Sequence, residues 1–220
     1  MHVVVGVNGS GRSAVLGAVA AAATTVHAGS VTDAPSGATV LVDDAHLLPD
    51  HRVDEIAAAA TRSDITLVLA TAPRRYDSRI EKLVASAGAA RLTLVPLDKT
   101  SIASRAAAVA RPISASLASA IAKSTGGLLV AVDAALAALG GERSDPTPLR
   151  AVTESVAEQH RRILVDTTDD TRAVLLAARF GVVPDPVTAA QLVTRPADAE
   201  TVVDIACSSG LLDATGALIP

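Results

Sequence analysis

The stretch VVVGVNGSGRS, Val3 to Ser13, decides the fold of this chain. It opens with a β-branched run, breaks into a loop that contains Gly6, Gly9 and Gly11, and leads into an alanine-rich segment of helical character near Arg12. Glycines admit positive φ angles that turn successive N–H groups inward, and the start of the next helix is positively polarised. The order strand, glycine loop, helix therefore predicts a site for a phosphate chain.

The spacing of the loop residues sharpens this prediction. Gly6, Gly11, Arg12 and Ser13 fit the pattern G-x-x-x-x-G-K-[ST] except that arginine replaces the lysine. Ser13 would offer its hydroxyl to Mg²⁺, and Arg12 would replace the lysine with a bulkier, planar cation. We expect nucleotide binding with weak or absent hydrolysis; the alternative is that the glycines serve only the turn. The predicted nucleotide-binding residues of the loop are Gly6, Asn8, Gly9, Ser10, Gly11, Arg12 and Ser13.

A second stretch, Thr39 to Asp44, supplies two carboxylates. Its apolar part, 39–42, lacks alternation, which is typical of a strand buried on both faces of a parallel sheet. Side chains at the carboxyl end of such a strand face the crevice where α/β sheets bind ligands. We predict that Asp43 holds Mg²⁺ and that Asp44 is the catalytic residue that orients or deprotonates a water. The alternative is a polar strand end with a helix-capping aspartate.

The rest of the first half alternates between strands and helices. Further strands are predicted over 65–70 and 91–95, with a short one at 26–31, and helices over 12–24, 52–62 and 78–87. Such alternation predicts right-handed βαβ units, hence a parallel sheet with helices on both faces. The glycine loop, Asp43, Asp44 and Thr71 would then share the carboxyl edge of that sheet.

Beyond Pro96 the pattern becomes helical. Helices over 100–109, 113–123 and 128–139 predict a small helical lid, and a Gly- and Pro-containing linker follows at 140–148. The remainder predicts a compact winged-helix-like domain. Its expected helices and its final short strands cover 149–165, 170–178, 186–193, 197–208 and 211–219.

The composition argues against several kinds of binding surface and against an internal disulfide. The 220 residues are 50% hydrophobic with one Phe, one Tyr and no Trp, so the core is aliphatic and stacking on nucleobases is disfavoured. A net charge of −4 argues against a nucleic-acid-binding surface, and the single cysteine, Cys207, excludes an internal disulfide. We expect Cys207 to be a buried thiol. No basic leader or long apolar span is seen, so we expect a cytoplasmic protein without membrane contact.

His46 and His51 lie near acidic residues, which raises the question of a metal site. Zinc sites need ligands at tight helical or knuckle spacing, and no glutamate or cysteine joins these two histidines. We therefore expect His46 to be a structural residue at the strand exit.

The chain as a whole resembles the nucleotide-binding module of the STAND class of AAA-type ATPases, in particular LuxR-type or MalT-like bacterial transcription regulators. The residues that carry the resemblance are the loop 6–13 (Walker A), the acidic stretch 42–47, the third strand 67–71, the segment 94–97, the turn 124–127 and, for the winged-helix domain, the tail 210–212. The resemblance implies an α/β fold: a P-loop NTPase-like parallel sheet with helices on both faces, then a helical lid and a winged-helix-like domain. The corresponding domains are 1–97, 98–140 and 149–220.

The resemblance also implies a function. Such modules bind ATP or ADP with Mg²⁺ between sheet and lid and switch between resting and oligomerising states, while a separate helix-turn-helix domain binds DNA. This chain would then be a regulatory switch, either a fragment of a larger regulator or a free-standing relative. It would reach DNA only through a domain not present in this chain.

This sequence departs from the family pattern at Arg12, at Leu129 in place of a proline, and at Ala72. An arginine that senses the γ-phosphate is usual near Ala72, so Thr71 and Arg74 are the predicted nucleotide contacts there, with Arg75 next to them. The departures leave two alternatives open. One is a degenerate pseudo-ATPase scaffold that mediates self-association or partner binding, and the other is an active P-loop ATPase.

Overall fold

The structure is a computed structural model, and it describes residues 1–27, 31–73, 79–139, 154, 157–158, 160–162, 164–165 and 167–212. The chain divides into two compact units, Met1–Leu94 and Val95–Pro220. Each unit is described by itself below.

The first unit is built on a five-stranded sheet in the order β2-β3-β4-β1-β5. Every neighbouring pair of strands is parallel, and β4 separates β1 from β3. The predicted parallel sheet is therefore confirmed. The strands are β1 (His2–Val5), β2 (Val26–His27), β3 (Thr39–Val42), β4 (Thr66–Thr71) and β5 (Ala90–Thr93).

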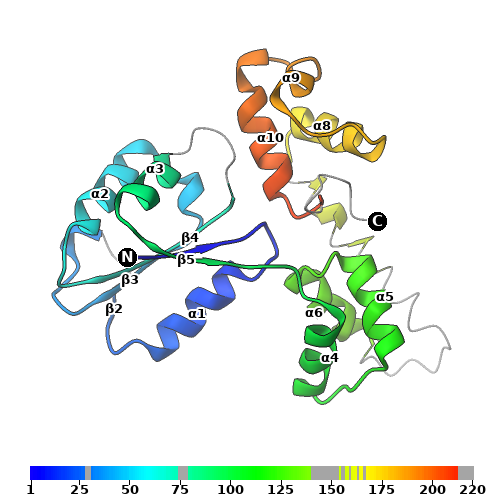
Figure 1. Ribbon diagram of the computed structural model, residues 1–220, viewed down its shortest axis with the longest axis horizontal. Helices are drawn as coiled ribbons and strands as arrows, with labels where there is room; N and C mark the ends of the chain where they lie inside the picture. Colours follow the sequence, from blue (N-terminus) through cyan, green and yellow to red (C-terminus); the bar gives the residue numbers. More distant parts are fainter. Residues whose placement is uncertain are drawn as a thin grey trace. The chain divides into compact units, whose positions relative to one another are not determined.

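Helices cover both faces of this sheet, as predicted (Figure 1). Helix α1 (Arg12–Ala22) lies on one face, while α2 (Asp50–Ala60) and α3 (Arg79–Ser86) lie on the other. Alternate residues of β1 serve the two layers: Val3 and Val5 join the cluster with α2 and α3, and Val4 joins the cluster with α1. All three valines are buried, so β1 is packed on both sides.

Three strands differ from the predictions. Strand β5 covers Ala90–Thr93 instead of the predicted 91–95; it lies at the edge of the sheet beside β1, and all four of its residues are exposed. Of the predicted strand 26–31, Val26–His27 form β2, residues 28–30 lie outside the described residues, and Val31 begins a 3₁₀ helix, η1 (Val31–Asp33), that places its side chain in the core. In β3 only Val40 is fully buried, so this strand is less enclosed than its apolar run predicts.

In the second unit, three helices lie within two residues of the predicted bounds: α4 (Lys99–Ala108), α5 (Ala115–Thr125) and α6 (Leu129–Ala138). They pack around a cluster that includes Ile102, Ile121 and Val132, each 0% exposed. Side-chain caps begin two of them, since Asp98 accepts from the Ser101 N–H and Ser114 from the Leu117 N–H. An Arg105–Asp133 ion pair joins α4 to α6.

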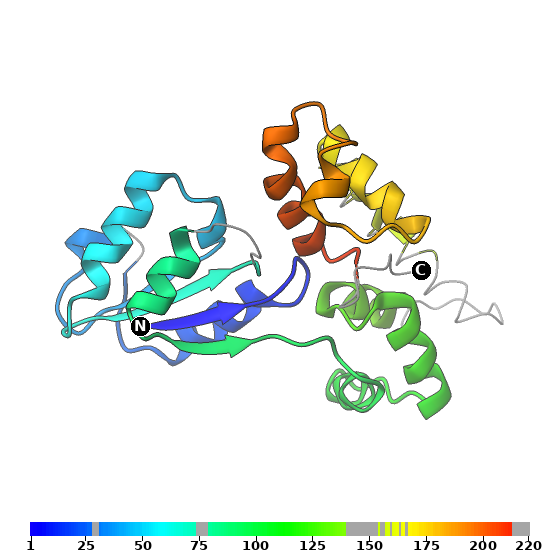
Figure 2. The same cartoon turned by 45° about the horizontal axis from the view of Figure 1, so that its top comes forward.

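The last described elements are α8 (Asp169–Arg179), α9 (Pro186–Ala189), η3 (Pro196–Asp198) and α10 (Ala199–Ser208), and α10 packs on α8 and α9 (Figure 2). Helix α9 ends at Ala189, so the helix predicted over 186–193 is wrong in its length. Cys207 is half-buried in α10, rather than fully buried as expected.

Several predictions fall on residues that the structure does not describe. The linker 140–148, most of the helix 149–165 and nearly all of the hairpin wing at 211–219 lie outside the described residues. The winged-helix part and the three domain boundaries therefore stay predictions. None of the helices in the described ranges has the length and apolar character needed to cross a membrane.

The glycine turn after α5 connects two segments of the second unit. Gly127 adopts a φ of 71°, its N–H donates to Thr125 Oγ1 at 3.1 Å, and its carbonyl accepts from the Leu97 N–H at 2.8 Å. A Cβ at this position would lie 2.4 Å from the Leu97 carbonyl oxygen. Glycine is therefore required here both by backbone conformation and by close approach.

Gly127→Ala should lower the free energy of unfolding by roughly 2 to 4 kcal/mol, because it combines a left-handed conformation with overpacking. Urea denaturation would measure this. Gly181→Ala is the matched control, since Gly181 has a φ of 81° but no atom lies within 4 Å of the place that a Cβ would take. The control should lose only the conformational part, about 1 to 2 kcal/mol. Equal losses in the two variants would contradict the close contact with Leu97.

Candidate functional site

The glycine loop joins β1 to α1 at the carboxyl edge of the sheet. The Gly6 N–H donates to the Thr71 carbonyl at 3.2 Å, so the β1–β4 pairing continues into the loop. Gly9 and Gly11 have φ of 77° and 101°, as the sequence predicts. Gly6 lies close to its neighbours, because a Cβ there would lie 2.2 Å from Ser10 Oγ and 3.1 Å from the Cβ atoms of Ser10 and Leu94.

The loop presents unused donors. Helix α1 has no side-chain cap, and its first turn carries no acidic residue. Within the described part of the chain, the N–H groups of Gly6 and Ser10 donate to backbone carbonyls, whereas those of Asn8, Gly9 and Gly11 have no protein acceptor. Such N–H groups at a helix N-terminus form an anion-binding geometry.

The loop meets the acidic strand end through a short hydrogen bond. Ser13 Oγ donates to Asp43 Oδ2 at 2.6 Å, and the Asp44 N–H donates to Asp43 Oδ1 at 2.8 Å. Ser13 and Asp43 are both exposed, so a ligand can reach them. The structure therefore brings together the two residues that the sequence assigns to Mg²⁺.

Arg12 makes two contacts that the sequence did not predict. Its Nη1 donates to the Gly6 carbonyl at 2.6 Å, and its Nη2 donates to Asp44 Oδ1 at 2.7 Å. The Arg12 side chain is only 10% exposed, whereas that of Asp44 is 49% exposed. Only the opposite charges of Arg12 and Asp44 could have signalled this pairing, since 32 positions separate them.

Asp44 does not cap a helix. It precedes the 3₁₀ helix η2 (Ala45–Leu47) in the left-handed region, with φ 46° and ψ 42°, and makes no side-chain capping bond. Left-handed backbone is uncommon for a non-glycine residue, although aspartate tolerates it better than most. The alternative of a helix-capping aspartate is therefore wrong, and the side chain is held by Arg12 instead.

Two further predicted residues lie close to the loop. Thr71 is 1% exposed and its Oγ1 donates to the Ala72 carbonyl, so it contributes to the site through its own carbonyl, which binds Gly6. His46 Nδ1 accepts from the Ala72 N–H at 3.2 Å, which ties η2 to the exit of β4 and agrees with the structural role we expected. Arg74 lies outside the described residues.

The described residues contain no group of three or more His, Cys, Asp or Glu side chains able to hold a metal. A Mg²⁺ ion does not need such a cage, since it is commonly bound by one or two protein ligands together with water and phosphate oxygens. The hydroxyl of Ser13 and the carboxylate of Asp43 are oxygen ligands of this kind. The donor set therefore fits Mg²⁺ together with a phosphate chain, and it does not fit a protein-only site.

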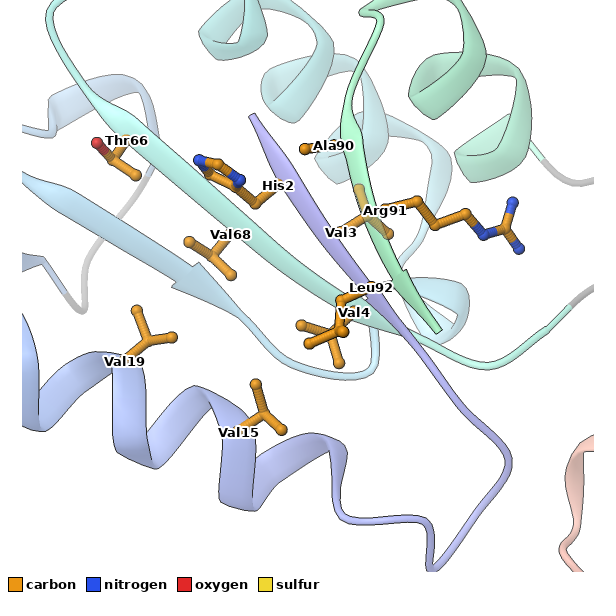
Figure 3. A pocket seen from close by; sticks show the side chains of 10 residues that line it. All are labelled: His2, Val3, Val4, Val15, Val19, Thr66, Val68, Ala90, Arg91 and Leu92. Atoms are coloured by element: carbon orange, nitrogen blue, oxygen red, sulfur yellow. The ribbon is translucent and has the colours of Figure 1, made fainter. Parts of the chain in front are cut away.

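A hollow of about 400 Å³ lies elsewhere in the first unit, between α1 and the sheet (Figure 3). Aliphatic side chains line it, among them Val15 and Val19 of α1, Val68 of β4 and Leu92 of β5. It includes residues at the amino ends of the strands, such as His2, and none of the loop. Most of its lining is aliphatic, and the Arg91 guanidinium that borders it is paired with Glu81.

Comparisons with known proteins identify the fold. The sequence matches no protein-family model and no curated protein. The structure is similar to that of RuvB from Thermotoga maritima, described as a Holliday junction branch migration motor, with 16% identity and a TM-score of 0.52. The match covers 100% of this chain and 84% of that chain. A variant of the same protein, with one threonine replaced by valine, matches with 17% identity, a TM-score of 0.55 and the same coverage.

A STAND protein with a tetratricopeptide repeat sensor from Pyrococcus horikoshii matches with 15% identity, over 99% of this chain and 38% of that chain, at a TM-score of 0.46. A TM-score below 0.5 does not establish a shared fold. The RuvB matches, at this low identity, show the fold alone. The chain therefore has the α/β P-loop NTPase-like fold that the sequence predicts, with the glycine loop after its first strand.

Gly6→Ala should lower the free energy of unfolding by about 1 to 3 kcal/mol, because the new methyl group would overlap Ser10 Oγ. Ser10→Gly should restore most of that loss in the double variant, since the Ser10 hydroxyl is buried without a partner. Thermal unfolding of both single variants and of the double variant would measure the coupling. Additive losses would contradict the close approach of these two residues.

Proposed function

We propose that this chain is a nucleotide-binding module that takes ATP or ADP with Mg²⁺ and acts as a regulatory switch with weak or absent hydrolysis. The observation that carries the proposal is the 2.6 Å contact between Ser13 and Asp43, directly beside a loop with unused N–H donors. Ser13 and Asp43 would hold Mg²⁺, directly or through water. The ion would supply charge neutralisation for the phosphates.

Charge explains why the site needs a cation. Asp43 and Asp44 bring two negative charges to the loop, and Arg12 brings one positive charge. A phosphate chain placed next to this set would be repelled at short range in a partly desolvated site. A divalent cation between Ser13 Oγ and Asp43 would reverse the sign of the local field. We therefore expect nucleotide binding to depend on Mg²⁺.

The proposal of weak hydrolysis rests on Asp44. Catalysis requires a residue that orients the attacking water within hydrogen-bonding distance of one of its oxygens. Asp44 Oδ1 is occupied by the Arg12 guanidinium at 2.7 Å. That contact fixes the direction of the carboxylate and leaves fewer lone pairs to orient a water, and the residue after Thr71 is alanine rather than a phosphate-sensing arginine.

We further propose that the switch belongs to a transcription regulator of the LuxR type, as the resemblance of the loop, the acidic strand end and the glycine turn implies. DNA would be reached through another domain, and self-association would accompany the switch. The second candidate is a pseudo-ATPase scaffold, which the Arg12–Asp44 pair favours because it fills the loop with a protein contact. An active ATPase ranks third, and it predicts a turnover that Asp44→Asn abolishes.

Isothermal titration of the full chain with ATP and with ADP, with and without Mg²⁺, tests this function. Ser13→Ala and Asp43→Asn should each weaken Mg²⁺-dependent binding about tenfold or more, equivalent to about 1.4 kcal/mol, because each removes an oxygen that would face the ion. Ser101→Ala is the control in the second unit, since Ser101 belongs to helix α4, where it caps the helix with Asp98, and not to the loop or the acidic strand end.

Binding in the wild-type chain that both site variants lose and the control keeps would support the nucleotide switch. No binding of either nucleotide by the wild-type chain at millimolar concentration would contradict it and favour the scaffold. Binding that is unaffected by removal of Mg²⁺ would contradict the roles given to Ser13 and Asp43.

A further inference from the structure

We infer that Arg12 makes this site selective for a nucleoside diphosphate over the corresponding triphosphate. The inference rests on the proposed function, because it assumes that the loop binds the phosphate chain. It concerns whether a diphosphate or a triphosphate fits the loop, and it follows from the two contacts of the Arg12 guanidinium.

The γ-phosphate of a bound triphosphate would lie near Asp44. Phosphoryl transfer proceeds with the attacking and leaving oxygens roughly in line, and the residue that orients the water lies beyond the terminal phosphorus. Asp44 is the residue placed to take that role. A γ-phosphate would therefore have to lie between the N–H groups of the loop and the carboxylate of Asp44.

Arg12 already links the loop to Asp44. The Arg12 guanidinium joins the start of the loop to that carboxylate, with Nη1 on the Gly6 carbonyl at 2.6 Å and Nη2 on Asp44 Oδ1 at 2.7 Å. Its side chain is only 10% exposed, so it is packed in place and does not extend into solvent. A diphosphate on the loop leaves this bridge intact, whereas a triphosphate has to displace it.

The contacts of Arg12 with Gly6 and Asp44 resist displacement by a γ-phosphate. Both contacts are short and the one to Asp44 is charge-assisted, which makes it stronger than a neutral hydrogen bond. Asp44 is set toward Arg12 by its left-handed backbone and by the bond from its N–H to Asp43 Oδ1. Releasing Arg12 would leave the Asp44 carboxylate beside a γ-phosphate of the same charge. Lysine would differ, because its compact ammonium lacks the planar fork that spans two fixed acceptors.

Titration of the full chain with MgADP and MgATP, by calorimetry, tests the inference. The wild-type chain should bind ADP about tenfold tighter than ATP or more, a ratio equivalent to about 1.4 kcal/mol. Arg12→Lys and Asp44→Asn should each bring the two dissociation constants together, mainly through tighter ATP binding. Asp44→Asn is well suited because asparagine also tolerates the left-handed backbone.

Arg52→Lys is the matched control, since it alters an Arg–carboxylate pair, Arg52–Glu55, within helix α2 and away from the loop. It should keep the wild-type preference. Equal affinities in the wild-type chain, or tighter binding of ATP, would overturn the inference while leaving the proposed function standing. A preference for ADP that Asp44→Asn does not reduce would also overturn it. Failure to bind either nucleotide would overturn the proposed function, and the inference with it.

Discussion

The hydrogen bond between Ser13 and Asp43 is the contact on which the rest of the site depends. It joins the first turn of α1 to the end of β3, across the intervening strand β4. Parallel pairing makes this contact possible, because β1, β3 and β4 all end at the same edge of the sheet. Gly6 then binds the Thr71 carbonyl beneath the loop, and His46 binds the Ala72 backbone beside it. The sheet topology therefore brings these side chains and backbone groups together without a bound ligand.

Arg12 adds a second link across the same edge. Lysine at this position of the loop pattern is a mobile point charge, whereas the arginine is held at both ends, by Gly6 and by Asp44. The loop is thus stabilised by a contact within the protein, and that contact engages one oxygen of the carboxylate that we propose for hydrolysis. Both the proposed weak hydrolysis and the preference for a diphosphate come from this one substitution.

Much of the first unit could be predicted from the sequence, since β-branched runs ending in glycine or aspartate define β1 and β3, and the helical spacing of Val53 and Ile56 defines α2. The proximity of Ser13 and Asp43 was also predictable, because the loop and Asp43 were both expected at the carboxyl edge of one parallel sheet. The Arg12–Asp44 pair could not be predicted, because it depends on the left-handed backbone of Asp44 and on side-chain reach. The end of α9 at Ala189 could not be predicted either, since after Pro186 at its start, residues 187–193 carry no glycine or proline that would stop the helix.

The central claim is that a nucleotide's phosphates bind to the backbone of the glycine loop. Hydrogen–deuterium exchange of the full chain, with and without MgADP, tests this claim most directly because it reports on the N–H groups themselves. The account predicts slower exchange over Asn8–Ser13 and over the Asp43–Asp44 strand end when MgADP is present. Unchanged exchange in the loop under conditions where MgADP binds, with protection only elsewhere in the chain, would contradict it.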